Sequence, residues 1–190
     1  LVIWTTTTCT LPGNMAICLG PDYEYCAVKA NGEDYSMAKE LAPAAMEAAS
    51  ISDYELIGSV TGKDLEYIVC QHPFLDRDSL VIVGDHVTLD SGTGCVHTAP
   101  GHGVEDFEVC VNHYPEISIV VPVDNEGRLT KEAGEFAGLK TDDANKAIAK
   151  KLEETGTMFA VQKIVHQYPH CWRCKHPIIY RPTEQWFCSV

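Results

Sequence analysis

Basic side chains are scarce in this sequence. Its 190 residues include 14 Lys and Arg against 27 Asp and Glu, which gives a formal net charge of −13 at pH 7. Because contacts to nucleic-acid phosphates depend on Lys and Arg, this balance argues against a surface that grips a long stretch of nucleic acid. The distribution is uneven: residues 1–154 hold 10 basic and 26 acidic side chains, whereas residues 155–183 hold four basic and no acidic ones. A domain that handles only a terminal nucleotide needs few phosphate contacts, so that role stays open.

Long apolar runs are absent as well. No stretch reaches the roughly 18–20 apolar residues of a membrane span, and no basic segment leads into an apolar one as in a secretory leader. We therefore expect no membrane contact and a cytoplasmic location. Strand-like residues begin at once and the pattern stops abruptly at the end, so we expect the chain to be cut from a longer polypeptide. An apolar content of 45% is enough for a real core.

Paired cysteines are also largely missing. Nine cysteines is an odd number, and contexts such as Ala16-Ile17-Cys18 indicate buried free thiols in a reducing compartment. Only Cys171 and Cys174 have the spacing of a metal or redox pair, and a four-cysteine zinc site needs a second pair. This pair could therefore supply half of a zinc site in a longer protein. Three histidines near it could recruit adventitious zinc: His166, His170 and His176.

The segment Gly92–Phe107, GTGCVHTAPGHGVEDF, has the highest density of glycines and of side chains that can bind or react with a ligand. It holds four glycines, two histidines and two acidic residues. Glycines let the backbone take positive φ and approach a ligand closely. A strand carrying His97, a loop after Pro100 and a helix that begins near Val104 together form a frequent design for a small-molecule site. On these residues alone, plain turns at the glycines remain an alternative.

A second polar segment, Trp4–Asn14, lies at the start of the chain and reads WTTTTCTLPGN. It places five threonines within six residues and ends in a Pro-Gly-Asn turn signal. The simpler interpretation is a polar edge strand. The functional one is a loop of hydroxyls and backbone N–H groups that lines a polar pocket.

The rest of the pattern predicts many short strands and a few helices. Strands are expected at residues 2–7, 15–19, 23–30, 54–60, 66–70, 80–83, 94–98, 117–123 and 158–166. Helices are expected at residues 35–49, with a kink near Pro43, at 104–113 and at 141–155, the last capped by Thr141 and stopped by Gly156. Asn31-Gly32 could be a hairpin turn or a helix lead-in. This pattern indicates an α+β fold around a closed or nearly closed barrel.

These two segments and Pro169–Lys175, PHCWRCK, resemble the editing insertion of bacterial-type isoleucyl-tRNA synthetases in their order and spacing. The resemblance runs from Ile3 to Phe187. It implies a β-barrel-like editing domain with peripheral helices at residues 1–166, and a strip at residues 167–190 that returns to the parent catalytic core. The implied reaction is hydrolysis of mischarged valyl-tRNA(Ile), with valyl-adenylate as a further substrate, by a second sieve. A second sieve is needed because one missing methylene changes binding in an apolar pocket by only about 1–3 kcal/mol, and Ile/Val discrimination by these synthetases is a known example of that limit.

The resemblance also implies roles for single residues. Catalysis is expected at Thr5, Thr6, Thr7 and Asp106, with the threonines holding the ester carbonyl, the ribose and the attacking water. Asp106 would pair with the substrate α-ammonium; its alternative role is that of an acid favoured at a helix N-terminus. His97 would close the amino-acid pocket sterically. Further substrate contacts are expected from Thr10, Asn14, Thr98, Gly101 and His102.

The pattern contains no serine–histidine–aspartate arrangement, and we expect substrate-assisted hydrolysis. In this reaction the free vicinal ribose hydroxyl would help to orient or activate water, and positioning would supply most of the acceleration. Editing would need no cofactor, zinc could be held in the full-length enzyme, and ATP and Mg²⁺ would belong to the parent synthetic site. The implied partners are the 3′ end of tRNA(Ile) carrying valine and the rest of the parent synthetase.

Three residues depart from the family pattern WTTTPWTLPAN. Thr8 replaces proline, Cys9 replaces tryptophan and Gly13 replaces alanine. Since proline would fix φ and the indole would add packing surface, we expect a less preorganised loop.

Two other functions remain as alternatives. One is a zinc-ribbon-type binding module centred on Cys171 and Cys174, and the other is a thiol oxidoreductase that uses the same pair. Neither explains the two N-terminal segments. A valyl or leucyl editing domain would carry Thr-Thr-Arg-Pro, which this chain lacks.

Overall fold

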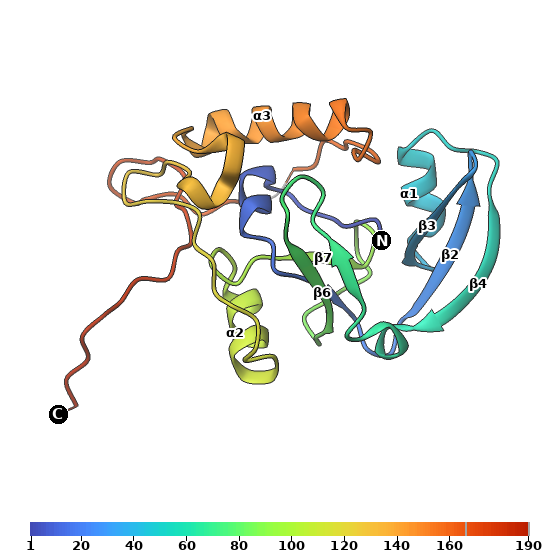
Figure 1. The fold of residues 1–190 in the computed structure, drawn as a ribbon, viewed down its shortest axis with the longest axis horizontal. Coiled ribbons are helices and arrows are strands. Elements are labelled where there is room, and N and C mark those ends of the chain that lie inside the picture. Colours follow the sequence, from blue (N-terminus) through green and yellow to red (C-terminus); the bar gives the residue numbers. More distant parts are fainter. Residues whose placement is uncertain (166, 190) are drawn as a thin grey trace.

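The chain folds into two β-sheets with three helices around them, as a computed structural model that describes residues 1–165 and 167–189 shows (Figure 1). One sheet has four strands in the order β5-β6-β1-β7, and the other has three in the order β3-β2-β4. The strands are β1 (Ala16–Leu19), β2 (Glu24–Ala30), β3 (Glu33–Ala38), β4 (Glu55–Thr61), β5 (Val69–Gln71), β6 (Asp78–Val83) and β7 (Cys95–Thr98). The helices are α1 (Ala42–Ala48), α2 (Val104–His113) and α3 (Thr141–Glu154), and the 3-10 turns are η1 (Thr8–Gly13), η2 (Gly62–Leu65) and η3 (Lys131–Phe136).

The four-stranded sheet carries apolar residues on both faces. Ala16 and Cys18 of β1 pack with Val109 and Cys110 of α2 on one face. Ile17 and its neighbours pack on the opposite face. Since successive side chains of a strand point to opposite faces, β1 separates these two parts of the core.

Helix α3 covers a further core cluster, which it shares with η1. Apolar side chains from both elements meet there, including Cys9, Leu11, Ile148 and Leu152. The turn η1, which contains Thr8 and Thr10, is therefore packed against α3 (Figure 1).

The two longer helices form close to their predicted ranges. Helix α2 matches its range, begins after Gly103 and has two acids in its first turn, where the helix dipole favours negative charge. Helix α3 also forms, and Gly156 at φ +71° follows its end. The predicted N-cap is wrong by one residue, because Lys140 occupies that position and Thr141 already lies in the helix.

The predicted helix at residues 35–49 is wrong in its first half. Asn31 and Gly32 take positive φ, 53° and 82°, and form the hairpin turn that pairs β3 with β2. Pro43 then stands in the first turn of α1, where its missing N–H costs no helix hydrogen bond. The apolar residues at helical spacing therefore form a helix only from Ala42 onward.

Three predicted strands do not form among the described residues. In residues 2–7 only Trp4 bridges to Val96, and in 117–123 only Val123 bridges to Leu129. The first segment turns away because the Thr5 hydroxyl accepts the Thr7 N–H that a ladder would use. Residues 158–165 also lack strand structure. Met158 and Phe159 are half-buried against the core, whereas Val161, Ile164 and Val165 are exposed. The last residue of that predicted strand, His166, lies outside the described residues.

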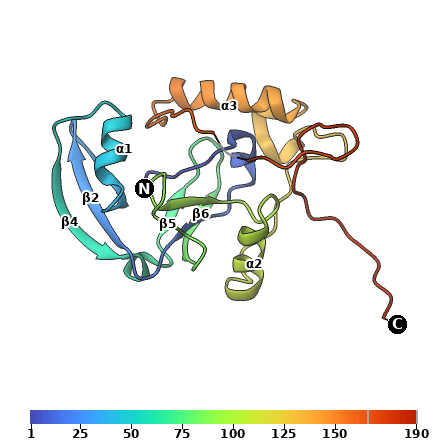
Figure 2. The same ribbon diagram turned by 180° about the vertical axis from the view of Figure 1, so that it is seen from behind.

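The α+β prediction is confirmed, but the closed barrel is not found within the described residues. Each sheet ends in outer strands, β5 and β7 in one and β3 and β4 in the other. Figure 2 shows the two sheets as separate layers from behind and the C-terminal segment leaving the body. The predicted domain boundary at residues 166/167 stays a prediction. No helix in the described part of the chain is long and apolar enough to cross a membrane.

Candidate functional site

The threonine loop, defined here as Thr5–Thr10, leads from the bridge at Trp4 into η1. Its hydroxyls bond to its own backbone: Thr5 Oγ1 accepts from the Thr7 N–H at 3.1 Å, and Thr10 Oγ1 donates to the Thr7 carbonyl at 2.8 Å. Such bonds stabilise a local turn in place of a strand ladder. The loop thus holds its own shape while Thr6 stays exposed.

His97 brings three of the predicted site residues together. On β7 it lies opposite Ile17, its Nε2 is 3.1 Å from Thr10 Oγ1, and its Nδ1 is 2.8 Å from Asn14 Nδ2. The side chain is only 7% exposed. Burial, reinforced by the neighbouring His72 and His102, lowers the pKa of His97 to about 3. The ring is therefore neutral, and its hydrogen bond to Thr10 holds the threonine loop against β7.

Four residues that the sequence analysis missed hold this region in place. The Ser79 hydroxyl donates to Asn14 Oδ1 at 2.6 Å. His72 Nε2 lies 2.8 Å from the Leu11 carbonyl, and Arg77 Nη1 donates to the Pro12 carbonyl at 2.6 Å. From α3, the Asn145 side chain accepts from the Cys9 N–H at 2.7 Å. A local signal existed only for His72, whose His-Pro dipeptide indicates a turn; the other three are far away in sequence and follow no motif.

The threonine loop borders a pocket with a volume of about 930 Å³, which we call the larger pocket in comparison with the one at the turn between β5 and β6. The start of the chain through η1, strand β6 and the turn before β7 contribute to its lining, which includes Trp4, Thr5, Thr6, Thr8, Leu11, Asn14, Ser79 and Thr93. Residues 156–162 and the β2–β3 hairpin contribute further lining. An edge-to-face contact between Tyr35 and Phe159, with ring centroids 5.0 Å apart, joins these two segments. The pocket thus presents threonine hydroxyls beside apolar surface.

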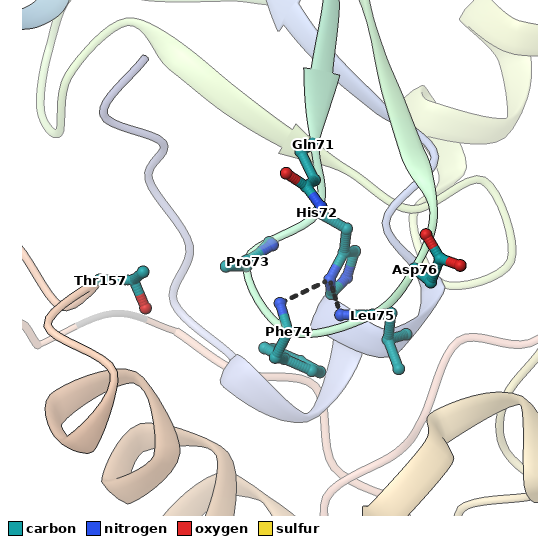
Figure 3. Close-up of a pocket in the computed structure, with 7 residues that line it drawn as sticks. All are labelled: Gln71, His72, Pro73, Phe74, Leu75, Asp76 and Thr157. Atoms are coloured by element: carbon teal, nitrogen blue, oxygen red, sulfur yellow. Dashed lines mark hydrogen bonds between the residues drawn. The ribbon is translucent and has the colours of Figure 1, made fainter.

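The smaller pocket, of about 480 Å³, lies at the turn between β5 and β6 (Figure 3). There the His72 ring points into the turn, and its Nδ1 accepts from the N–H groups of Phe74 and Leu75 at 3.3 and 3.1 Å. Because its other nitrogen bonds to Leu11, both ring nitrogens are engaged. His72 therefore has a structural role, because its ring holds η1 in place. We take the larger pocket as the candidate site, because threonine hydroxyls line it.

Asp106 and Thr98 lie on the other side of β7. Thr98 pairs with Ala16, so it shares the α2 face, whereas His97 shares the face of Ile17. Asp106 Oδ2 accepts from the Ala99 N–H at 2.8 Å, and burial raises the pKa of this carboxyl group. Among the described residues, no cationic side chain forms an ion pair with it. The structure thus places this acid beneath the strand end that carries His97, outside the lining of the larger pocket.

The glycine loop between β7 and α2 packs against protein backbone and side chains. A Cβ at Gly101 would collide with the Val120 carbonyl oxygen, and a Cβ at Gly13 would come within 3.1 Å of the His102 ring. His102 Nδ1 lies 3.0 Å from the Tyr180 carbonyl oxygen, which ties the loop to the C-terminal segment. Gly101 and His102 are therefore explained by loop geometry, and their predicted substrate contacts stay predictions.

Cys171 and Cys174 form a tight turn. The Cys171 N–H donates to the His176 carbonyl at 2.8 Å, and the Lys175 N–H donates to the Cys171 carbonyl at 2.9 Å. Hydrogen bonds from the backbone N–H groups of Cys174 and Arg173 lower the pKa of the Cys171 thiol, which suits a metal-binding thiolate. Within residues 1–165 and 167–189, however, no three His, Cys, Asp or Glu side chains converge on one point. The pair fits half of a zinc site, and His166 lies outside the described residues.

Comparison with curated proteins identifies relatives along the whole chain. The sequence is 60% identical to the isoleucine–tRNA ligase of Caldicellulosiruptor bescii and 52% identical to that of Moorella thermoacetica. Both matches cover 100% of this chain and 20% of the relative, so the chain spans about a fifth of the length of the curated relatives it matches. No protein-family model matches it.

Solved structures share the fold. GlLeuRS-CP1 superposes with a TM-score of 0.63 at 17% identity and covers 87% of this chain and 82% of its own. The editing domain of the P. knowlesi cytosolic leucyl-tRNA synthetase superposes with a TM-score of 0.59 at 9% identity and covers 80% and 81%, respectively. At these identities the similarity establishes a common architecture, with helices and sheets arranged as in synthetase editing domains.

Proposed function

We propose that the chain is the editing domain of an isoleucine–tRNA ligase, because over its whole length it is similar to one segment of such enzymes. Its reaction is hydrolysis of valyl-tRNA(Ile), with valyl-adenylate as a further substrate. The observation that carries this proposal is the larger pocket, whose lining includes the hydroxyl-bearing residues Thr5, Thr6 and Thr8.

The threonine loop acts on the ester by positioning. Backbone N–H groups and hydroxyls of Thr5, Thr6 and Thr7 hold the ester carbonyl oxygen as negative charge develops on it. Water attacks the ester carbonyl carbon, and the bond between this carbon and the ribose oxygen breaks. The ribose oxygen takes up the proton that the water loses, so the products are free valine and tRNA with its ribose hydroxyl restored. The vicinal ribose hydroxyl orients or activates this water, so orientation supplies most of the acceleration.

In this proposal Asp106 anchors the α-ammonium of the bound amino acid, although its carboxyl group lies outside the lining of the larger pocket in this structure. Two observations support this role: burial raises the pKa of its carboxyl group, and among the described residues the carboxylate accepts one hydrogen bond, from the Ala99 N–H. A substrate ammonium would compensate a carboxylate in this setting. His97 limits the size of the amino-acid pocket from the neighbouring strand face.

Replacing Asp106 in the full-length ligase tests this proposal. Asp106→Ala should lower the rate of valyl-tRNA(Ile) deacylation by at least about 100-fold, because a buried charge pair is lost, while isoleucine activation stays intact. Glu105→Ala is the matched control, since this neighbouring acid is exposed. Wild-type deacylation by the Asp106→Ala enzyme would refute the assignment.

Further components belong to the whole enzyme. The partners are the 3′ end of tRNA(Ile) carrying valine and the rest of the synthetase, in the cytoplasm. Editing uses no cofactor, and ATP and Mg²⁺ serve the synthetic site. Cys171 and Cys174 would hold zinc together with ligands from elsewhere in the ligase.

The second candidate function is a zinc-ribbon-type module centred on Cys171 and Cys174, which the lowered pKa of the Cys171 thiol favours. It requires stoichiometric zinc and unfolding by a chelator. Metal analysis of the 190-residue chain separates it from the editing proposal.

A further inference from the structure

The turn η1 begins without a cap of its own. The first backbone N–H groups of a helix have no acceptor within it, and the side chain just before the helix usually supplies one. Thr7 occupies that position, but its side chain makes no capping bond; its hydroxyl lies 3.4 Å from that of Thr6 instead. The N–H of Cys9, the second residue of η1, therefore depends on an acceptor from outside the turn.

Asn145 of α3 supplies this acceptor from a distant part of the chain. Its Oδ1 accepts from the Cys9 N–H at 2.7 Å. The Thr8 hydroxyl lies 3.1 Å from the same oxygen and 2.9 Å from the Asn145 carbonyl oxygen, so its hydrogen serves either one. Because the Cys9 N–H can only donate, the side-chain oxygen of Asn145 must face it, and the amide nitrogen must point away. Asn145 thus bonds to two consecutive residues of η1.

The helix that carries this cap is also a wall of the larger pocket. Ala149 and Leu152 line the pocket, and they follow Asn145 by four and seven positions, on the same side of α3. Thr8 lines the pocket as well, whereas Asn145 lies outside the lining that the described residues form. The bonds of Asn145 therefore join the threonine loop to the wall that α3 provides.

The other contacts of the loop do not replace this cap. The bond from Thr10 to the Thr7 carbonyl lies within the loop and does not tie it to α3. His97 holds Thr10 against β7. The Cys9 side chain packs in the cluster that α3 covers, but apolar contact has no direction. Among the described residues, every hydrogen bond between α3 and the loop comes from Asn145.

We infer that Asn145 is a positioning residue of the editing site, which caps η1 from α3 and so holds the threonine loop at the wall of the larger pocket. Its effect on deacylation rests on the editing function proposed above. Without this cap the Cys9 N–H must turn to water, and the loop loses its directional link to α3. Since orientation of the reacting groups supplies much of the acceleration, we expect a slower reaction with little change in substrate binding.

Hydrogen exchange of the Cys9 amide in the 190-residue chain tests the cap without an enzymatic assay. Asn145→Ala should speed this exchange about tenfold, and α3 itself should persist because alanine favours helix. Asn145→Asp keeps an oxygen acceptor and should stay within about twofold of wild type. Unchanged exchange in Asn145→Ala, or equally fast exchange in Asn145→Asp, overturns the inference.

Lys151→Ala is the matched control for both measurements. It removes a different contact of α3, the 2.8 Å ion pair between Lys151 and Glu135 of η3, and leaves the bonds of Asn145 in place. Exchange of the Cys9 amide should therefore match wild type. Acceleration as large as that in Asn145→Ala would mean that the general docking of α3, and not the cap, holds the loop, and would overturn the inference.

Kinetics of the full-length ligase provide the second readout. Asn145→Ala should lower kcat for valyl-tRNA(Ile) deacylation about tenfold and leave KM within about twofold, whereas Asn145→Asp should recover most of the rate. Faster exchange at Cys9 with a wild-type kcat, or no recovery in Asn145→Asp, overturns Asn145 as a positioning residue. A wild-type ligase that does not deacylate valyl-tRNA(Ile) refutes the editing function instead, and the exchange result stands apart from it.

Discussion

The side chain of Cys9 fills a core position between η1 and α3, at the place where the family pattern WTTTPWTLPAN has tryptophan. It is 6% exposed and packs in the cluster that contains Ile148 and Leu152. The adjacent Thr8 hydroxyl donates to the Asn145 carbonyl at 2.9 Å. Thr8 and Cys9, which we expected to make the loop less preorganised, thus both hold it against α3.

The double substitution Thr8→Pro with Cys9→Trp should therefore destabilise the chain. An indole exceeds the space that a cysteine occupies in this cluster, and overpacking costs about 1–3 kcal/mol. Proline fits the first position of η1, but it removes the hydroxyl bonds to Asn145. Urea unfolding of the double variant, with Thr8→Pro alone as the control, measures the effect. Equal or greater stability of the double variant would show that the core has room for the ring.

The buried histidines make stability depend on pH. Burial lowers the pKa of His97 from an ordinary 6.5 to about 3, so the unfolded chain binds a proton over a range in which the folded chain does not. The stabilisation is complete above about pH 6.5 and is lost as pH falls toward 3, at up to about 1.4 kcal/mol per pH unit. His72 and His102, whose pKa values burial also lowers, act with the same sign.

Unfolding free energies measured from pH 7 to pH 4 check this sign. The difference between wild type and His97→Gln should shrink as pH falls, because glutamine does not titrate. His113→Gln provides the control, since His113 is exposed at the end of α2. A difference that is constant across this range would contradict a depressed pKa at His97.

The turn η1 is held by two neighbouring elements in addition to its own hydrogen bonds. The segment between β5 and β6 contributes His72 and Arg77, which bond to its carbonyls, and α3 contributes Asn145. A short 3-10 helix has little stability of its own. Its shape therefore depends on these contacts.

Arg77→Ala should increase the local opening of η1 while leaving the sheets intact. Loss of the bond to the Pro12 carbonyl should speed hydrogen exchange of the Asn14 amide about tenfold. Arg128→Ala is a matched control, because Arg128 Nη1 also donates to a backbone carbonyl, that of Gly138. Equal exchange at Asn14 in wild type and Arg77→Ala would show that His72 and Asn145 suffice.

The charge of the entire chain bears on tRNA binding. With a net charge of −13, the chain repels a polyanion, and few phosphates can be neutralised by its 14 Lys and Arg. We expect the isolated chain to bind tRNA with a Kd above about 10 μM at physiological salt. Filter binding measures this, with the full-length ligase as the control. Tight binding by the isolated chain would mean that its basic C-terminal residues suffice as a tRNA surface.

The larger features of the fold follow from local pattern. Helices α2 and α3 form where periodicity and charged ends predict them, and the α+β class and the similarity to isoleucine–tRNA ligases were both accessible from sequence. The threonine and glycine segments were found for the same reason, since their composition is unusual over a few consecutive residues. Local signals of this kind suffice because helix periodicity and turn chemistry act between near neighbours.

Tertiary contacts alone decided the rest. Residues 33–38 became a strand because a hairpin turn placed them beside β2, despite helical spacing. The supports of the threonine loop come from residues up to 137 positions away, such as Asn145 bonding to Thr8. Ser79 has no unusual local context, and only the pairing of β6 with β1 brings it to Asn14. Hydrogen bonds between distant segments leave no periodic trace in a single sequence, so the fold itself had to reveal them.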